Sequence, residues 1–142
     1  MVGPNAPIRF EGIKATCSKN AYDFYKPNMD SPFPTVDGKL SINCYFDALD
    51  YCFERYKTNF ERITGEKFEI ENSANFFLFH SPFVKLVRKS FARIYFNEWR
   101  RGNLDLCSDF AGVDPNLRNI SNEASYTHNE MFKIFTEITN QR

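Results

Sequence analysis

An apolar stripe with helical spacing runs through the middle of this 142-residue chain and constrains its fold more than any other feature. Its members recur at steps of three and four: Ile42, Tyr45, Phe46, Leu49, Phe53, Tyr56, Phe60 and Ile63. Such spacing places side chains on one face of a helix. Asp37 or Ser41 can cap its start, and Gly65 can end it. We therefore expect one long helix, with Cys44 and Cys52 on or beside its packed face.

A second apolar run, Phe76 to Phe79, is short and continuous. Bounded by Asn75 and His80, it is typical of a strand buried on both faces. Ser81 and Pro82 then form a natural helix start, since serine can cap the first N–H groups and proline has no N–H to leave unpaired. His80 would lie where a strand meets a helix, the edge at which α/β sheets bind ligands. A structural capping role and a role in proton transfer both fit this position.

The helix expected after Pro82 has one apolar and one basic side. Its apolar side contains Phe83, Leu86, Val87, Phe91, Ile94 and Trp99, and its basic side contains Lys85, Arg88, Lys89 and Arg93. Between Pro82 and Arg101 the only acidic residue is Glu98. Lys85 and Lys89 are four residues apart and share a face. Together with the helix N-terminus they suit an anionic ligand such as a phosphate. A solvated basic face opposite a core is the alternative.

Composition limits the possible classes of function. The chain has 18 basic and 18 acidic residues, so no overall field favours nucleic acid or a membrane surface. No apolar run approaches the roughly 20 residues of a membrane span, and we expect no signal peptide. Cys17, Cys44, Cys52 and Cys107 lack CxxC spacing, so neither a zinc site nor a disulfide framework is favoured. A reducing compartment fits best.

The two ends of the chain are predicted to contain less regular secondary structure than its centre. Five of the seven prolines and three of the six glycines precede Lys39, which predicts loops and short extended pieces. Ile8 to Phe10 fits a short strand, and the aromatic stretch from Tyr22 must break at Pro27. Residues 103–121 are expected to form a loop. Thr127 to Glu130 forms a capping box for a last helix.

Four motifs occur in a fixed order along the chain: Gly3–Pro7, Ala21–Pro27, Val36–Ile42 and Phe79–Phe83. In this order they resemble the eukaryotic 3-hydroxy-3-methylglutaryl-coenzyme A (HMG-CoA) synthase family. The resemblance covers nearly all of these residues and a middle part of a full synthase. It implies a partial thiolase-like α/β fold that is rich in helices. Residues 1–38 would be the loop-rich end of the N-terminal half, and residues 39–142 the start of the C-terminal domain.

The resemblance also implies an activity. Members of the family are homodimeric acyltransferases that condense acetyl-CoA with acetoacetyl-CoA to HMG-CoA, in mevalonate (isoprenoid) or ketone-body synthesis. These CoA thioesters are substrates, so neither a cofactor nor a metal is expected. By its Phe-His-Ser-Pro context, His80 matches the catalytic histidine that acts on acetoacetyl-CoA, and Asp23 matches a supporting acid. Ser41, Lys85 and Lys89 match positions that contact substrate or CoA.

The chain departs from the family pattern at the nucleophile. The family's nucleophilic cysteine and acid/base glutamate would precede Met1, and no cysteine here stands in the nucleophile motif. Without that thiolate no acyl-enzyme can form, so we expect the chain alone to be inactive or nearly so. The strand at Phe76 to Phe79 would lack neighbours, which predicts a marginal monomer that associates readily.

Two other functions remain as alternatives. The first is a non-catalytic module that binds CoA or a synthase subunit through the basic helix from Pro82 to Arg101. The second, nucleic-acid binding by that helix, is less favoured because the net charge is zero and no binding motif is present. We expect no membrane partner, and a cytoplasmic location with a mitochondrial one as the alternative.

Overall fold

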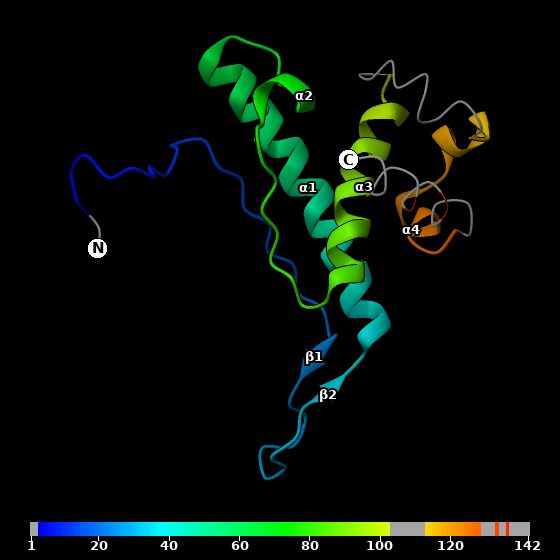
Figure 1. The fold of residues 1–142 in the computed structure, drawn as a ribbon. Coiled ribbons are helices and arrows are strands. Elements are labelled where there is room, and N and C mark those ends of the chain that lie inside the picture. The colour runs from blue at the N-terminus through cyan, green and yellow to red at the C-terminus, as the bar shows by residue number, and fades with distance from the viewer. Residues whose placement is uncertain (1–2, 103–112, 129–132, 134–135, 137–142) are drawn as a thin grey trace.

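The computed structural model describes residues 3–102, 113–128, 133 and 136. In chain order its elements are β1 (Phe24–Tyr25), β2 (Thr35–Val36), α1 (Gly38–Thr64), α2 (Ile70–Ser73), α3 (Val84–Arg100), the 3-10 helix η1 (Pro115–Asn119) and α4 (Asn122–Ser125) (Figure 1). β1 and β2 are antiparallel and form a two-stranded sheet. The described part of the chain is thus rich in helix, and none of its helices is long and apolar enough to cross a membrane.

The long helix predicted from the apolar stripe is confirmed as α1. Its first turn is capped by Asp37, whose carboxylate accepts a hydrogen bond from the Leu40 N–H at 2.9 Å. Its last turn ends at Gly65, which has a φ of 75°. Glycine adopts this left-handed conformation without the steric clash that a Cβ would cause. Both predicted ends are therefore observed, each set by a local contact.

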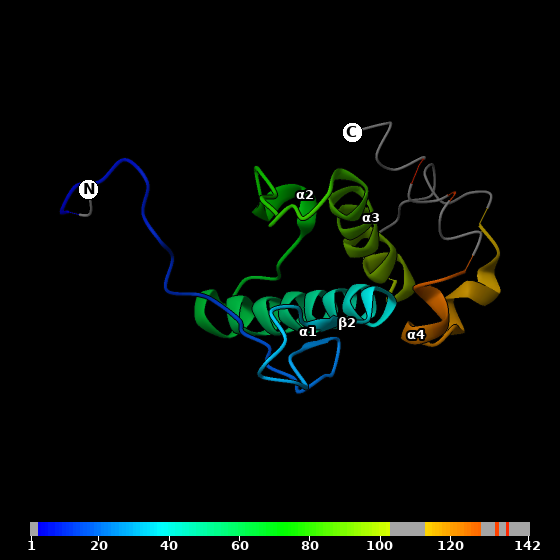
Figure 2. The ribbon, with the colours of Figure 1, turned by 90° about the horizontal axis from the view of Figure 1, so that it is seen from below.

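α3 lies against α1 (Figures 1 and 2). Aromatic side chains of both helices pack in the main core cluster. The main core cluster consists of Phe68, Ile70, Ala92, Ile94, Tyr95, Phe96, Trp99 and Leu117. Phe68 meets three rings of α1 edge to face, with centroid distances of 5.9 Å to Phe53, 5.5 Å to Tyr56 and 5.3 Å to Phe60. Aromatic pairs of this geometry stabilise a core beyond the burial of their area. The stripe predicted on α1 is therefore a packing surface.

A smaller cluster joins the other end of α1 to the start of α3. It contains Phe46, Leu86 and Tyr126, and the rings of Phe46 and Tyr126 stack at 5.6 Å. Tyr126 directly follows α4, so this cluster also holds the chain after α3 against α1. The core thus extends along α1 on both sides of its midpoint.

The strand predicted at Phe76 to Phe79 is not present. The segment has no strand partner among the described residues, and Phe76 and Leu78 are 86% and 95% exposed. Phe77 and Phe79 are half-buried, and their rings lie 6.5 Å apart. One side of the segment packs and the other faces solvent, as expected for an extended chain without a neighbouring strand. The prediction of a strand buried on both faces is wrong here, because no neighbouring strand covers the second face.

Three smaller predictions also change. α3 begins at Val84, and its N-cap Phe83 makes no side-chain cap, so Ser81 and Pro82 precede the helix. Ile8 and Phe10, expected in a short strand, are 84% and 100% exposed and pair with no strand among the described residues. In the predicted loop 103–121, residues 103–112 are outside the described residues and residues 115–119 form η1. The capping box at Thr127 to Glu130 extends beyond the described residues.

Residues 11–23, which we call the strap, run beside α1 toward β1 (Figures 1 and 2). Four contacts hold the strap to α1: Tyr56 donates to Glu11, Asn59 donates to the Lys14 carbonyl, Lys19 pairs with Asp47, and Ser41 donates to Asp23. From Lys14 to Asp23 the residue number rises along the strap while it falls along α1 from Asn59 to Ser41, and only the Glu11–Tyr56 contact departs from this order. From Lys14 onward the strap is therefore antiparallel to the helix.

Candidate functional site

Two of the predicted site residues, Asp23 and Ser41, meet at the start of α1. The Ser41 hydroxyl donates to Asp23 Oδ2 at 3.0 Å, and the Asp37 N–H donates to the Asp23 carbonyl at 2.7 Å. Both side chains are half-buried. Asp23 precedes β1 and Asp37 follows β2, so the β1–β2 hairpin returns the chain to the same place. The hairpin therefore holds this carboxylate and hydroxyl together.

His80 lies on the extended segment before α3 and is exposed. The Tyr45 hydroxyl donates to its backbone carbonyl at 3.4 Å, a long hydrogen bond. Tyr45 is one turn beyond Ser41 on α1, so the two side chains share a face. The structure thus brings the backbone of His80 to the face of α1 that carries Ser41, while the residue itself faces solvent.

Lys85 and Lys89 lie in the first two turns of α3. Leu86, between them, is buried against Phe46, which fixes the rotation of this part of the helix. Burial and then the charge of Lys85 lower the pKa of Lys89. The two ammonium groups are therefore close enough to repel each other. A polyanion bound between them would relieve this repulsion.

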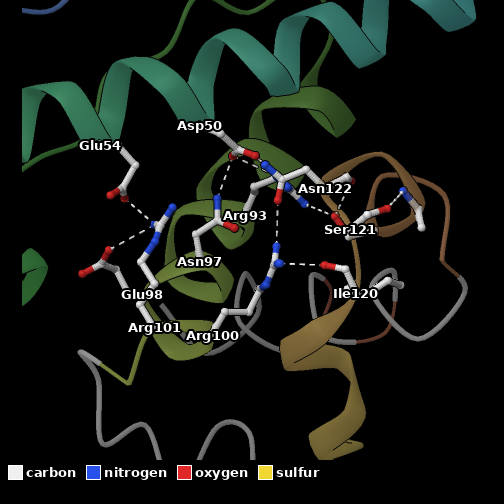
Figure 3. Close-up of polar contacts among 12 residues, drawn as sticks. Asp50, Glu54, Arg93, Asn97, Glu98, Arg100, Arg101, Ile120, Ser121 and Asn122 are labelled. Carbon is white, nitrogen blue, oxygen red and sulfur yellow. Dashed lines mark hydrogen bonds and ion pairs between the residues drawn. The ribbon is translucent and has the colours of Figure 1, made fainter.

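Arg93, predicted on the basic side of this helix, is fully buried, and that prediction is wrong. Its Nε and Nη2 donate to the Asp50 carboxylate at 2.9 Å and 2.6 Å, and its Nη1 donates to Ser125 Oγ at 2.7 Å (Figure 3). Its guanidinium carbon lies 4.5 Å from the centroid of the Tyr126 ring. Asn97 donates to the same carboxylate at 2.6 Å. We call Asp50, Arg93, Asn97 and Ser125 the buried network; it joins α1, α3 and α4.

A second buried pair lies further along the same two helices. Lys57 Nζ is 2.6 Å and 2.8 Å from the two carboxylate oxygens of Glu98, and both side chains are buried. Arg101 lies between Glu98, at 3.8 Å, and Glu54, with which it also pairs (Figure 3). These ion pairs connect α1 to α3 and contain none of the predicted site residues. We assign them a structural role.

The positions of two charged residues on α1 predict these buried pairs, although the apolar periodicity by itself does not. Asp50 and Lys57 stand four residues after Phe46 and Phe53, and so on the apolar face of α1. A charge on a packed face must find an opposite charge, because burying it alone costs several kcal/mol. Each position therefore predicts a buried partner. Which residue of α3 provides that partner depends on how the two helices pack.

A cavity of about 750 Å³ lies between α2, the extended segment and α3. Its apolar lining consists of Ile70, Ala74, Phe76, Phe77, Phe79, Val87, Phe91 and Tyr95, and Glu71, Asn75 and Arg88 complete it. His80, Asp23, Ser41, Lys85 and Lys89 do not line it. We keep the candidate site at these five residues, because the family resemblance gives them catalytic and substrate-binding roles, whereas it gives none to the charged residues of the cavity, Glu71 and Arg88.

Comparison with known proteins identifies the family. Residues 8–142 match the family described as hydroxymethylglutaryl-coenzyme A synthase C terminal. The chain belongs to this family. The resemblance inferred from the four sequence motifs is thereby confirmed.

Relatives in several organisms agree with this assignment. The chain is 44% identical over 140 residues to hydroxymethylglutaryl-CoA synthase A of Dictyostelium discoideum, covering 98% of this chain and 28% of the relative. It is 38% identical over 152 residues to the cytoplasmic synthase of Rattus norvegicus, covering 100% and 29%. It is 37% identical over 140 residues to the mitochondrial synthase of Mus musculus, covering 94% and 27%. The chain thus spans less than a third of the length of these relatives.

A solved structure supports the fold. The chain matches the structure of MvaS in complex with 3-hydroxy-3-methylglutaryl coenzyme A with a TM-score of 0.53 and 24% identity. The match covers 87% of this chain and 28% of that one. The helix-rich segment therefore corresponds to part of the HMG-CoA synthase fold, as predicted. The expected α/β character appears in the described residues only as the β1–β2 pair.

Proposed function

We propose that these residues form part of an HMG-CoA synthase active site, the part that binds a CoA thioester and presents His80 to its acyl group. The observation that carries this proposal is the Tyr45 contact, which holds the His80 segment on the face of α1 that bears Ser41. Membership of the family supplies the reaction, condensation of acetyl-CoA with acetoacetyl-CoA. The complex of MvaS with HMG-CoA supports a CoA thioester as the ligand.

Each residue has a distinct role in this proposal. Lys85 and Lys89 place two positive charges on one face of α3, where phosphate groups of CoA would bind. His80 polarises the acetoacetyl carbonyl or moves a proton there, since an imidazole can do both near neutral pH. The Ser41 hydroxyl contacts the acyl chain, and Asp23 orients that hydroxyl by accepting its hydrogen bond.

The proposal assigns covalent chemistry to groups outside these 142 residues. An acyl-enzyme needs an activated thiolate, and members of a catalytic set act as a unit. We therefore propose that the 142 residues alone bind the thioester without turning it over, and that no cofactor is needed. The same proposal includes three further expectations: a domain boundary at residue 38, assembly as a homodimer, and a cytoplasmic location. Relatives named for the cytoplasm and for mitochondria both match the chain.

Calorimetric titration of the chain with acetoacetyl-CoA tests this function. We expect saturable binding that His80→Ala and Lys85→Ala/Lys89→Ala both weaken, the double variant by about tenfold or more because two charged contacts are lost. Lys26→Ala/Lys67→Ala is the matched control: it removes the same charge from exposed positions and should leave the affinity unchanged. Absence of binding by a folded chain, or equal loss in the control, would refute the proposal.

A second candidate function rests on the exposed side of the extended segment. Phe76 and Leu78 are 86% and 95% exposed and neighbour the apolar cavity. Unpaired extended backbone beside exposed apolar side chains is a surface on which a further strand can add. We propose as the alternative a non-catalytic module that binds a synthase subunit here. Co-elution with a full-length synthase, abolished in Phe76→Ser/Leu78→Ser, would support it, and separate elution would refute it.

A further inference from the structure

Three of the four cysteines are described by the structure, and all three lie where the strap meets α1. Cys17 is on the strap, whereas Cys44 and Cys52 are on α1; each is half-buried and carries a free thiol. None takes part in the proposed function. Because these half-buried thiols lie on two segments that are distant in sequence, a thiol of the strap can lie next to a thiol of α1.

The contacts on either side of Cys17 determine its register. The Asn59 amide donates to the Lys14 carbonyl at 3.1 Å, and Lys19 pairs with Asp47 at 2.7 Å. Five extended residues of the strap span about 17 Å at 3.3 Å each. The twelve residues from Asp47 to Asn59 span about 18 Å along the helix at 1.5 Å each. The two paths are similar in length, so an extended strap can follow α1 from one anchor to the other.

This register places Cys17 opposite one cysteine of α1 and away from the other. Cys17 lies three-fifths of the way from Lys14 to Lys19. The corresponding point on α1 is about seven residues before Asn59, which is Cys52, at a helical rise of 1.5 Å per residue. Cys52 and Asn59 are also two turns apart and share a face. Cys44 lies beyond the Asp47 anchor, more than two turns further along α1.

Electrostatics agrees with this placement. Burial, followed by the charge of Cys17, raises the pKa of the Cys52 thiol. The two sulfur atoms are therefore within each other's field. The hydrogen bond to Asp47 and, to a smaller extent, the charges of Cys44 and Cys17 raise the pKa of Lys19. Cys52 is thus a poor first nucleophile at neutral pH, because the thiolate is the reactive form.

We propose that Cys17 and Cys52 form a reversible disulfide that fastens the strap to α1, by exchange with a low-molecular-weight disulfide such as oxidised glutathione. The Cys17 thiolate attacks one sulfur of that disulfide, which forms a mixed disulfide and releases one glutathione thiolate. Cys52, on losing its proton, attacks the Cys17 sulfur and releases the second. Two protein thiols are oxidised, the small disulfide is reduced to two thiols, and their protons balance.

The closed loop would contain two of the five candidate site residues. Residues 18–51 lie between the two cysteines and include Asp23, the β1–β2 hairpin and Ser41. Fastening the strap would restrict the segment that carries Asp23. In a reducing compartment such a bond forms only under oxidative conditions, as regulatory disulfides do. The site would then respond to the redox state without any change in its own residues.

Peptide mapping of the oxidised chain tests this inference, and its outcome does not depend on CoA binding. A Cys107→Ser chain at low concentration is treated with oxidised glutathione, and its disulfides are identified by mass spectrometry without reduction. We expect a peptide linking Cys17 to Cys52 as the main product, with free thiols falling from three to one per chain. Dithiothreitol should restore all three.

Two further variants separate this pairing from others. Cys44→Ser should form the same bond in the same yield. Cys52→Ser should keep glutathione attached to Cys17, since no second thiol can displace it. A main product that links Cys44, mixed disulfides alone in the Cys107→Ser chain, or unreacted thiols would each overturn the proposal.

Discussion

Replacing Arg93 by methionine removes the central charge of the buried network while keeping much of the side chain's volume. The Asp50 carboxylate would lose its bonds to the guanidinium and keep the one from Asn97. Removing one partner of a buried ion pair costs about 3–5 kcal/mol, because the other charge stays desolvated. Domains are stable by only about 5–15 kcal/mol in total. We therefore expect Arg93→Met to remove a large part of the stability of this chain.

Urea unfolding followed by tryptophan fluorescence measures this effect. Trp99 is the single tryptophan, is 7% exposed and belongs to the main core cluster, so its emission reports loss of that core. The double variant Arg93→Met/Asp50→Leu should recover much of the loss, since apolar side chains can replace a buried ion pair at little cost. Recovery will be incomplete, because Asn97 loses its acceptor at about 1–3 kcal/mol, whereas Ser125 keeps its hydrogen bond to the Asn122 carbonyl.

The exposed pair of Lys19 and Asp47 provides the control. Their side chains are 65% and 43% exposed, so Lys19→Met should leave the unfolding midpoint nearly unchanged. A loss below about 1 kcal/mol in Arg93→Met would refute the argument from desolvation. Additive losses in the double variant would do the same, because they would mean that the two charges do not interact.

Three further predictions concern single contacts. Tyr126→Phe should stabilise the chain by about 1 kcal/mol, since this hydroxyl is buried without a hydrogen-bond partner among the described residues. Burial raises the pKa of Tyr126 to about 12 from an ordinary 10.0, so the folded state keeps a proton that the unfolded chain releases. The contribution of Tyr126 to the free energy of unfolding should therefore be fully present below pH 10 and fall by up to about 2 kcal/mol as the pH rises through 12. Urea midpoints measured against pH should show this fall, and Tyr126→Phe should show a smaller one. Asp37→Ala should cost about 1 kcal/mol in the same assay, whereas Asp37→Asn should keep the helix cap and most of the stability; equal losses would argue against capping.

The parts of the fold that sequence predicts well are those that depend on near neighbours. The span of α1 follows from side chains three and four residues apart, and its ends follow from Asp37 and Gly65, each acting within one turn. Membership of the family can be inferred from short motifs, because they occur along the chain in the order typical of that family. The resemblance assigned Asp23 and Ser41 separately to the site, and only the structure shows their hydrogen bond, because the hairpin that joins them spans 17 intervening residues.

Two predictions failed where distant residues decide the outcome. The run from Phe76 to Phe79 has the composition of a buried strand, yet a strand needs a neighbour, and the described residues provide none. Arg93 fits a basic helix face by spacing. It is buried because Asp50 and Ser125, from two other elements, meet its guanidinium.

Local chemistry in the sequence thus determined the long helix, its caps, the basic character of α3 and the membership of a family. The tertiary structure alone decided which charges are buried and which side of the extended segment packs. The physical reason is the sequence separation over which each kind of interaction acts. Helix periodicity and capping act over three or four residues, whereas the partner of a buried charge or of an extended strand is selected by packing between segments tens of residues apart.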